Sequence, residues 1–257
     1  MRILGIDIGG TGIKSAIVET ATGKLAGKRI RAETPRRATP EQVARVLREQ
    51  ISAHEWDGPV GAGFPAVIRE DTVCTAANID ASFIGLPIAD YFSEQTGRPV
   101  FAINDADAAG LAEARFGAAR DIPGVVLVIT IGTGLGTSLF IGGKLLPNTE
   151  LGHLLLDNGM DAERYASESA RVRQKLSWKT WGKRFNRYLD AMEKLLWPDL
   201  IVLGGGISKQ REKFVPALKT RASVVTACYF NRAGIVGAAL YAETRLAKAL
   251  PVPHAVE

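Results

Sequence analysis

The chain has 257 residues, and its 46% hydrophobic and 23% charged fractions are ordinary for a globular protein. They exclude a disordered, collagen-like or coiled-coil chain, and the length suffices for one large domain or two of about 130 residues. Two cysteines are too few for a disulfide framework or a multi-thiolate metal site. The longest strongly apolar run, Val125 to Ile131, is too short to cross a membrane, and Asp7 interrupts any signal-peptide core. We therefore expect a cytoplasmic protein with no membrane partner.

A strand, a glycine turn and a second strand follow one another twice, in residues 3–18 and again in residues 125–141. The two turns are Gly9-Gly10-Thr11-Gly12 and Gly132-Thr133-Gly134-Leu135-Gly136. Ile6-Asp7-Ile8-Gly9 aligns with Ile129-Thr130-Ile131-Gly132. One repeat at this distance predicts two related α/β lobes, each opening with a glycine-turn hairpin.

Hydrophobic periodicity and capping residues predict the other elements. Helices are expected at 41–54, 106–116, 162–196, 208–218 and 234–250, and strands at 60–64, 100–103 and 200–203. Ser208 is the expected N-cap of its helix. The 162–196 helix carries an apolar stripe of Trp178, Trp181, Phe185, Leu189, Met192 and Leu196. We place a small N-terminal lobe at residues 1–108 plus 233–257 and a large C-terminal lobe at 109–232.

The glycine turns suggest phosphate binding, because backbone N–H groups can approach a phosphate where no Cβ intervenes. A Walker A loop and a dinucleotide fingerprint both need a helix after their glycines, and strands follow here. A third turn, Gly204-Gly205-Gly206, follows the strand at 200–203. A single glycine hairpin is ordinarily just a hairpin. Three such turns favour a phosphate held between two hairpin turns that face each other across a cleft.

Charged residues flank the first turn. Asp7 precedes it, and an inward carboxylate beside a phosphate turn typically holds Mg²⁺. Lys14 follows the turn and either reaches a phosphate as a point charge or is a surface strand residue.

Polar residues at the end of the 100–103 strand are candidates for catalysis. Asn104-Asp105-Ala106-Asp107 stands where ligands bind in α/β folds, and a carboxylate there can accept the proton of an attacking hydroxyl. Alternatively Asp105 or Asp107 caps the following helix, and of the two Asp107 better suits a structural role. Carboxylates, one imidazole and two amides complete a set suited to sugar hydroxyls: Glu150, His153, Glu163, Asn78 and Asn104.

Together these residues resemble the ROK family of sugar kinases, in the actin, hexokinase and heat-shock ATPase superfamily. The resemblance covers nearly the whole chain and implies two ribonuclease H-like lobes around a central cleft. It makes Asp105 the catalytic base, and it implies Mg²⁺ and a homodimer. It assigns the three glycine turns to the phosphoryl donor, with the third beside the nucleotide. It assigns the sugar to Asn78, Asn104, Asp105, Glu150, His153 and Glu163.

Differences from the typical family sequence indicate which members of the family this chain resembles. Residues 154–160 contain no cysteine where typical members have a zinc loop, so we expect no zinc site. Ala66 replaces the glycine of a Pro-Gly turn, and Phe83 stands where a tryptophan is usual. Short stretches such as Pro147 to His153 and Leu176-Ser177-Trp178 resemble the polyphosphate-dependent glucokinases of this family. That resemblance implies glucose as the acceptor and inorganic polyphosphate, or ATP as well, as the donor.

The basic residues are unevenly distributed. Residues 164–221 hold 14 basic and 5 acidic side chains, and residues 171–187 hold seven basic side chains and no acid. Either an anionic polymer binds there or the residues form a solvated face.

An ATP-dependent hexokinase of broader sugar range is the main alternative function. A sugar-responsive regulator that binds nucleic acid and an actin-type ATPase are more distant alternatives, and we expect no nucleic-acid partner.

Overall fold

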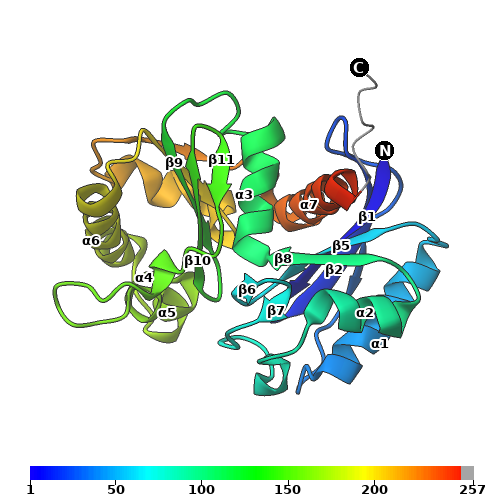
Figure 1. Cartoon of the computed structure of the whole chain (residues 1–257). Helices are drawn as coiled ribbons and strands as arrows, with labels where there is room; N and C mark the ends of the chain where they lie inside the picture. Colours follow the sequence, from blue (N-terminus) through cyan, green and yellow to red (C-terminus); the bar gives the residue numbers. More distant parts are fainter. Residues whose placement is uncertain (250–257) are drawn as a thin grey trace. The chain divides into compact units, whose positions relative to one another are not determined.

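The computed structural model describes residues 1–249 and divides the chain into two compact units. Unit 1 joins residues 1–108 to the segment that begins at Gly234, and unit 2 comprises residues 109–233. Each unit contains one main β-sheet with helices packed against it (Figure 1). Leu250, the last residue of the helix predicted over 234–250, lies outside the described residues.

The main sheet of unit 1 is built on the predicted hairpin. Strands β1 (Arg2–Gly9) and β2 (Gly12–Glu19) pair antiparallel, with Gly9 opposite Gly12. On the other side of β1, strands β5 and β8 follow in parallel, so the carboxyl ends of β1, β5 and β8 meet at one edge. The remaining strands of unit 1 are β3 (Lys24–Leu25), β4 (Ile30–Ala32), β5 (Val60–Phe64), β6 (Ile68–Arg69), β7 (Thr72–Val73) and β8 (Val100–Asn104).

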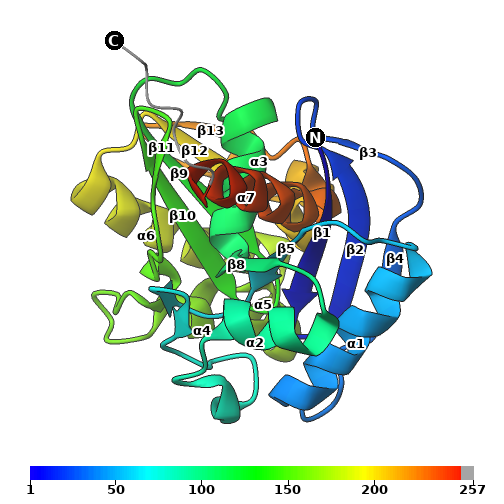
Figure 2. The same ribbon diagram turned by 45° about the vertical axis from the view of Figure 1, so that its right-hand side comes forward.

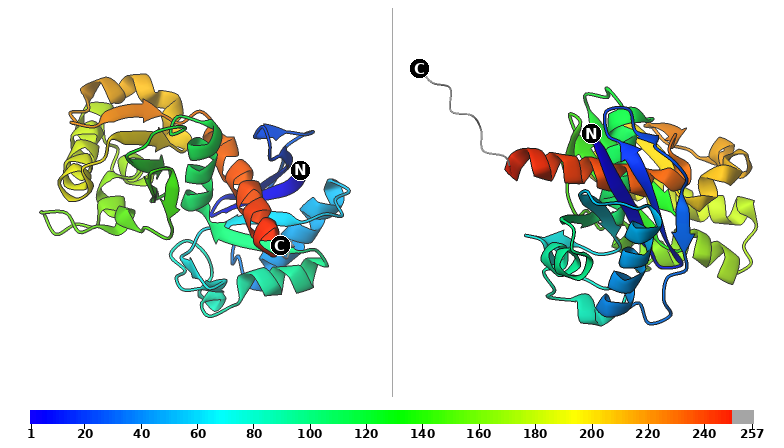
Figure 3. Two further views of the ribbon diagram at one scale, coloured as in Figure 1. Left: turned by 45° about the horizontal axis from the view of Figure 1, so that its top comes forward. Right: turned by 90° about the vertical axis from the view of Figure 1, so that its right-hand side faces the viewer.

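Helices cover both faces of this sheet (Figure 2 and Figure 3). Helices α1 (Pro40–Ala53) and α2 (Ile88–Thr96) pack on the apolar side chains of alternate β1 residues, together with the short 3-10 helix η1 (Ala81–Phe83). Helix α7 (Ala233–Ala249) lies on the opposite face, and its backbone touches the strands. A Cβ on Gly5 or Gly61 would overlap a carbonyl oxygen of α7, so glycine is required at both positions.

Unit 2 repeats the same strand arrangement. Strands β9 (Val125–Ile131) and β10 (Leu135–Ile141) form the second predicted hairpin, and β12 (Leu200–Gly204) lies parallel to β9. Strands β11 (Lys144–Leu146) and β13 (Ser223–Thr226) are the edges. Helix α6 (Trp178–Leu196) packs on one face through the predicted aromatic stripe, in which Trp181 and Phe185 are fully buried. Helix α3 (Asp105–Phe116) supplies Leu111 and Ala114 to the opposite face.

The single helix predicted over 162–196 is wrong. The segment forms three helices, α4 (Ala162–Ala166), α5 (Glu168–Arg173) and α6 (Trp178–Leu196). Ser167 adopts extended geometry and caps α5, accepting a hydrogen bond from the backbone N–H of Ala170. Lys175 has a positive φ of 51°, and Ser177 caps α6. Serine side chains that satisfy the free N–H groups of a new helix stabilise each restart.

The helix predicted over 208–218 is also wrong. The segment forms two 3-10 helices, η3 (Gly206–Lys213) and η4 (Val215–Ala217). Ser208 is not an N-cap, because it lies inside η3 and its hydroxyl donates to the carbonyl of Gly205 at 2.7 Å. Non-helical geometry at Gln210 and the proline at position 216 prevent a continuous α-helix.

Candidate active site

The first glycine turn joins two charged side chains of unit 1. Asp7 lies directly opposite Lys14 in the hairpin, and the Lys14 amine is 2.9 Å from Asp7 Oδ2. The Lys14 side chain is therefore ion-paired and only 26% exposed. It differs in both respects from the surface strand residue that was the alternative. At the start of α7, a Cβ on Gly234 would lie 2.8 Å from Asp7 Cγ. Glycine there lets the backbone of α7 pack directly against the carboxylate, because any side chain would overlap it.

Asn104 and Asp105 lie at the same sheet edge. Asn104 is 7% exposed, and its Oδ1 accepts hydrogen bonds from the backbone N–H groups of Ala106 at 2.9 Å and Asp107 at 3.0 Å. Its amide donates to the carbonyl of Ala66 at 3.1 Å. Asn104 therefore caps α3, a role that the sequence suggested for Asp105 or Asp107. Asp105 is partly exposed on the first turn of α3.

The remaining predicted residues of unit 1 lie around this edge. Gly63 pairs with Ile103 in the sheet, and a Cβ there would lie 3.6 Å from Asp105 Cα. A Cβ on Gly10 would lie 3.6 Å from the carbonyl oxygen of Asn78, so Asn78 adjoins the first turn. The atypical Phe83 is fully buried, with its ring 4.8 Å from that of Phe64. Phe83 is a core residue beneath the Pro65-Ala66 turn.

In unit 2, Glu163 is bound to the second glycine turn. Its Oε2 accepts a hydrogen bond from the backbone N–H of Leu135 at 2.9 Å. A Cβ on Gly134 would overlap this carboxylate, and a Cβ on Gly152 would overlap the carbonyl of Leu135. These glycines allow α4, which carries Glu163, and η2 (Leu151–His153) to pack directly against the turn.

His153 is held by an acid that sequence reasoning did not assign. Its Nδ1 lies 2.9 Å from Asp161 Oδ2, and the other oxygen of Asp161 accepts the backbone N–H of Arg164 at 3.0 Å, capping α4. The hydrogen bond to Asp161 raises the pKa of His153, burial opposes the rise, and the Glu163 and Glu150 carboxylates add to it. Because a carboxylate only accepts, Nδ1 carries a proton and Nε2 is the atom left to bind a ligand.

Glu150 completes this group. It is an exposed residue whose carboxyl is nevertheless partly surrounded by protein, and this burial raises its pKa. His153 opposes the rise and Glu163 adds to it. Two acids and one imidazole thus interact electrostatically in unit 2.

The third glycine turn adjoins the second. Gly205 has a positive φ of 80°, and a Cβ there would overlap the backbone of Ile131, the residue before Gly132. Ser169 of α5 also contacts the second turn, with its hydroxyl 2.5 Å from the carbonyl oxygen of Thr133. Both glycine turns predicted for the donor side of unit 2 therefore lie at the carboxyl ends of β9 and β12.

Of the residues that sequence reasoning missed, only Asp161 has a local signal. Asp161 stands just before Ala162 and Glu163, in a sequence typical of a helix N-cap. Ser169 and Gly234 act through contacts with distant segments, so no local pattern reveals them.

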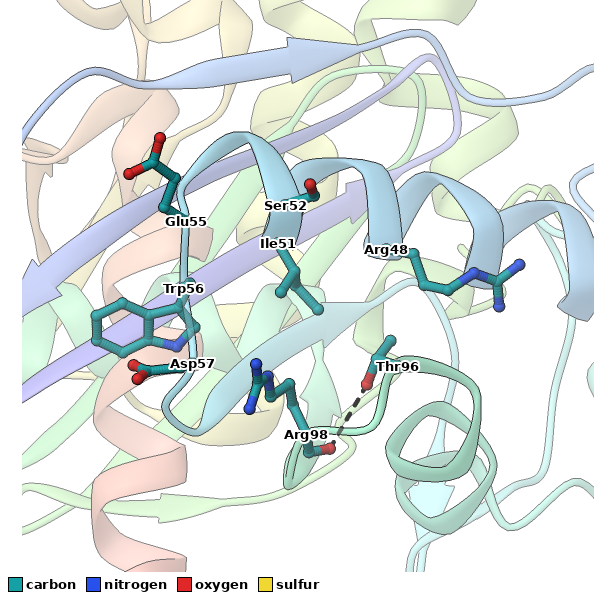
Figure 4. A pocket seen from close by; sticks show the side chains of 8 residues that line it. All are labelled: Arg48, Ile51, Ser52, Glu55, Trp56, Asp57, Thr96 and Arg98. Carbon is teal, nitrogen blue, oxygen red and sulfur yellow. Dashed lines mark hydrogen bonds between the residues drawn. The ribbon is translucent and has the colours of Figure 1, made fainter.

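A surface hollow of about 490 Å³ lies elsewhere in unit 1, between the ends of α1 and α2 (Figure 4). Its lining includes Arg48, Trp56 and Arg98 but none of the predicted site residues. Arg48 is bonded to Gln95, and the Trp56 indole donates to the carbonyl of Pro59. These groups are occupied in holding the fold, so we do not place the active site there.

Comparison with known proteins places the chain in a family. The ROK family model matches residues 3–174. The chain belongs to the ROK family. It is 46% identical over 237 residues to the polyphosphate glucokinase of Mycobacterium tuberculosis (strain CDC 1551 / Oshkosh), covering 92% of this chain and 89% of that protein.

Solved structures of other ROK proteins share its fold. An inorganic polyphosphate/ATP-glucomannokinase from Arthrobacter sp. strain KM superposes with a TM-score of 0.91 at 47% identity, covering 95% of this chain and 99% of that one. A ROK family glucokinase from Streptomyces griseus, in complex with glucose and AMPPNP, gives 0.78 at 26% identity, with 95% and 100% covered. This ROK member therefore has the actin-like ATPase fold expected from its sequence. Within residues 1–249, no helix has the length and apolarity to span a bilayer.

Proposed function

We propose that this chain transfers a phosphoryl group from inorganic polyphosphate to the 6-hydroxyl of glucose. The observation that carries the proposal is the 46% identity to a polyphosphate glucokinase over 92% of the chain. The site chemistry agrees with it. Three glycine turns offer backbone N–H groups to phosphates, and the carboxylates, amides and imidazole suit sugar hydroxyls.

Glucose binding is assigned to Asn78, Asn104, Asp105, Glu150, His153 and Glu163. The hydrogen bonds of unit 1 restrict what Asn104 can do. Its oxygen already accepts two N–H groups and its amide donates once, which leaves one N–H for a sugar hydroxyl. Glu163 similarly accepts the backbone N–H of Leu135 with one carboxylate oxygen, and it can still accept hydrogen bonds from the sugar. Both side chains are thus fixed by the fold before a ligand arrives, which lowers the entropic cost of binding.

Asp105 is assigned as the general base. It accepts the proton of the 6-hydroxyl as that oxygen attacks the terminal phosphorus and the bond to the donor chain breaks. The turns at Gly9–Gly12 and Gly132–Gly134, with Lys14, stabilise charge on the transferring group, and the Gly204–Gly206 turn takes the rest of the donor. Positioning and electrostatics supply most of the rate in such transfers.

The residues around Asp7 fit a magnesium ion. Mg²⁺ usually binds one or two carboxylates, substrate phosphates and several waters, so a single protein carboxylate is sufficient. Asp7 Oδ2 pairs with Lys14, so Oδ1 is the oxygen that would face the ion. Within residues 1–249 there is no cluster of three acidic, histidine or cysteine side chains for a metal held by protein alone. When bound, the ion neutralises charge on the phosphate oxygens.

The donor assignment is tested by measuring glucose 6-phosphate formation with Mg²⁺ and either polyphosphate or ATP at matched phosphate concentration. We expect a higher kcat/KM with polyphosphate. Turnover with ATP alone would replace the proposal with an ATP-dependent hexokinase. Turnover with neither donor would remove the kinase assignment altogether.

Asp161 leads to a prediction about sugar affinity. Replacing Asp161 with asparagine keeps the shape but removes the charge that holds His153, so we expect KM for glucose to rise about three- to tenfold with little change in kcat. The pKa of His153 should fall in this variant, because the hydrogen bond that raises it is weakened. The inflection in a plot of KM against pH that reports the titration of His153 should therefore move to lower pH. Steady-state kinetics across pH 5–9 would check this, and an unmoved inflection would contradict it.

The same pair gives a pH dependence of stability with a defined sign. The raised pKa of His153 stabilises the fold below its ordinary value of 6.5, and the gain is lost as pH rises through the folded value. Burial alone would raise the pKa of Asp161, but the Arg164 N–H and His153 lower it below 3.8, so its contribution is lost as pH falls through that lowered value. The Tm difference between the natural protein and Asp161→Asn should therefore be largest between about pH 4 and 6.5.

The cellular location and the oligomeric state are inferred from the cysteine content and from the resemblance to the ROK family. We propose a cytoplasmic homodimer. Cys74 and Cys228 are both free and exposed, which suits a reducing compartment. Light scattering on purified protein tests the assembly, and a mass of one chain would exclude the dimer.

A further inference from the structure

The seven basic side chains of residues 171–187 do not all have protein partners. Arg187 is 2.5 Å from Asp157, and Arg184 donates to Gln174 at 2.8 Å and stacks on Tyr165. Lys179 and Lys183 are exposed, and among residues 1–249 no acidic side chain lies within ion-pair distance of either amine. Like charges at i,i+4 destabilise a helix unless an anion neutralises them.

The C-terminal half of the same helix behaves differently. Lys194 pairs with Asp190 at 2.7 Å, and Glu193 accepts the backbone N–H groups of Arg221 and Ala222. Charge is therefore balanced within the second half of α6 and unbalanced in the first half. If α6 only presented a solvated face, nothing would favour leaving the lysines of its first half alone without ionic partners.

Two more cations converge beside the first turn of α6. The guanidinium of Arg171, from α5, lies 4.1 Å from the centre of a Trp178 ring, and the Lys213 amine, from η3, lies 5.5 Å from it. Arg171 Nε is buried and has no hydrogen-bond partner among the described residues. The guanidinium forms one ion pair, with Glu168 of the same helix at 3.9 Å. The tryptophan ring holds these cations together without neutralising them.

This cationic region is continuous with the donor side of unit 2. Helix α5 contacts the second glycine turn through Ser169 and reaches Trp178 through Arg171. The 3-10 helix η3 begins at Gly206 of the third turn and reaches the same ring through Lys213. Both elements thus lead from a phosphate turn to the start of α6; α5 and α6 are labelled in Figure 1.

We propose that Arg171, Lys213, Lys179 and Lys183, the cationic track, bind the part of a polyphosphate chain that extends beyond the phosphoryl group being transferred. The inference rests on the proposed function. ATP carries three phosphates and ends in a nucleoside, so it has no phosphate left for Lys179 and Lys183. A long linear polyphosphate carries a charge on every unit and can run from the turns along α6. Its binding releases counterions and weakens steeply with salt.

The test compares the double variant Lys179→Gln/Lys183→Gln with a control of equal charge change, Lys144→Gln/Lys194→Gln, whose lysines are exposed in the same unit. We expect the first variant to raise the ratio of KM for long-chain polyphosphate to KM for ATP about five- to tenfold. The control should leave that ratio unchanged. Tripolyphosphate should behave like ATP in both variants.

Binding measured without turnover separates this inference from the proposed function. Calorimetric titration of long-chain polyphosphate should show weaker binding to the Lys179/Lys183 variant, with a log Kd against log salt slope shallower by roughly one to two. Equal losses in variant and control, or equal losses with ATP, would overturn the track while leaving the kinase assignment intact. Single-stranded DNA of equal charge binding as tightly as polyphosphate would also overturn it. If the natural protein neither binds nor uses polyphosphate, the proposed function itself fails.

Discussion

Replacing Asp105 with asparagine is expected to lower kcat by about 10²- to 10⁴-fold, because the variant cannot accept the proton of the attacking hydroxyl. The change should barely affect folding, since Asn104 rather than Asp105 caps α3. Glucose affinity should stay within a few-fold, because an asparagine still bonds to a hydroxyl. Initial rates of glucose 6-phosphate formation, with calorimetric glucose binding and thermal melts on the same samples, would measure all three quantities.

Asp90→Asn is the matched control for this variant. Asp90 is an exposed acid in the first turn of α2, as Asp105 is in the first turn of α3, and it belongs to the same unit. It should retain full turnover. Turnover by Asp105→Asn within tenfold of the natural protein would remove Asp105 from the base role.

Gly61→Ala is expected to destabilise unit 1 by about 3 kcal/mol, which lowers Tm by roughly 6–12 °C. The new Cβ would overlap the carbonyl group of Ala238, and neither backbone can move aside without separating α7 from the sheet. Because Gly234 in the first turn of α7 packs against Asp7, turnover should fall as the helix shifts. Differential scanning calorimetry and activity at 25 °C would measure the two effects.

Gly182→Ala provides a control of opposite sign. Gly182 lies inside α6, and an added Cβ would meet nothing within 4 Å. Alanine in a helix interior is favoured over glycine by about 0.5–1 kcal/mol, so this variant should melt at a higher temperature. If Gly61→Ala were as stable as the natural protein, the backbone contact between β5 and α7 would be wrong.

Local sequence patterns were sufficient to predict the two glycine-turn hairpins. Each glycine turn lies between two apolar strands, and both the turn geometry and the strand pairing depend on residues that are close in the chain. The candidate site residues could be found for the same reason, since Asp7 and Asp105 each follow or end a strand whose apolar run is unmistakable. The assignment of Asn104, rather than an aspartate, as the cap of α3 could not be read in this way. It depends on the carbonyl of Ala66, 38 residues away, which fixes the orientation of the amide.

The sequence by itself determined the family, the two glycine-turn hairpins and the candidate site residues, because these depend on short runs of residues. Tertiary structure alone decided how those residues are held. The break of the 162–196 helix at Ser167 lets α5 contact the second turn, and the pairing of His153 with Asp161 fixes a ring nitrogen. Both are interactions between separate segments, whose free energy exists only when the chain has folded. Helical periodicity continues across such a break and therefore cannot reveal it.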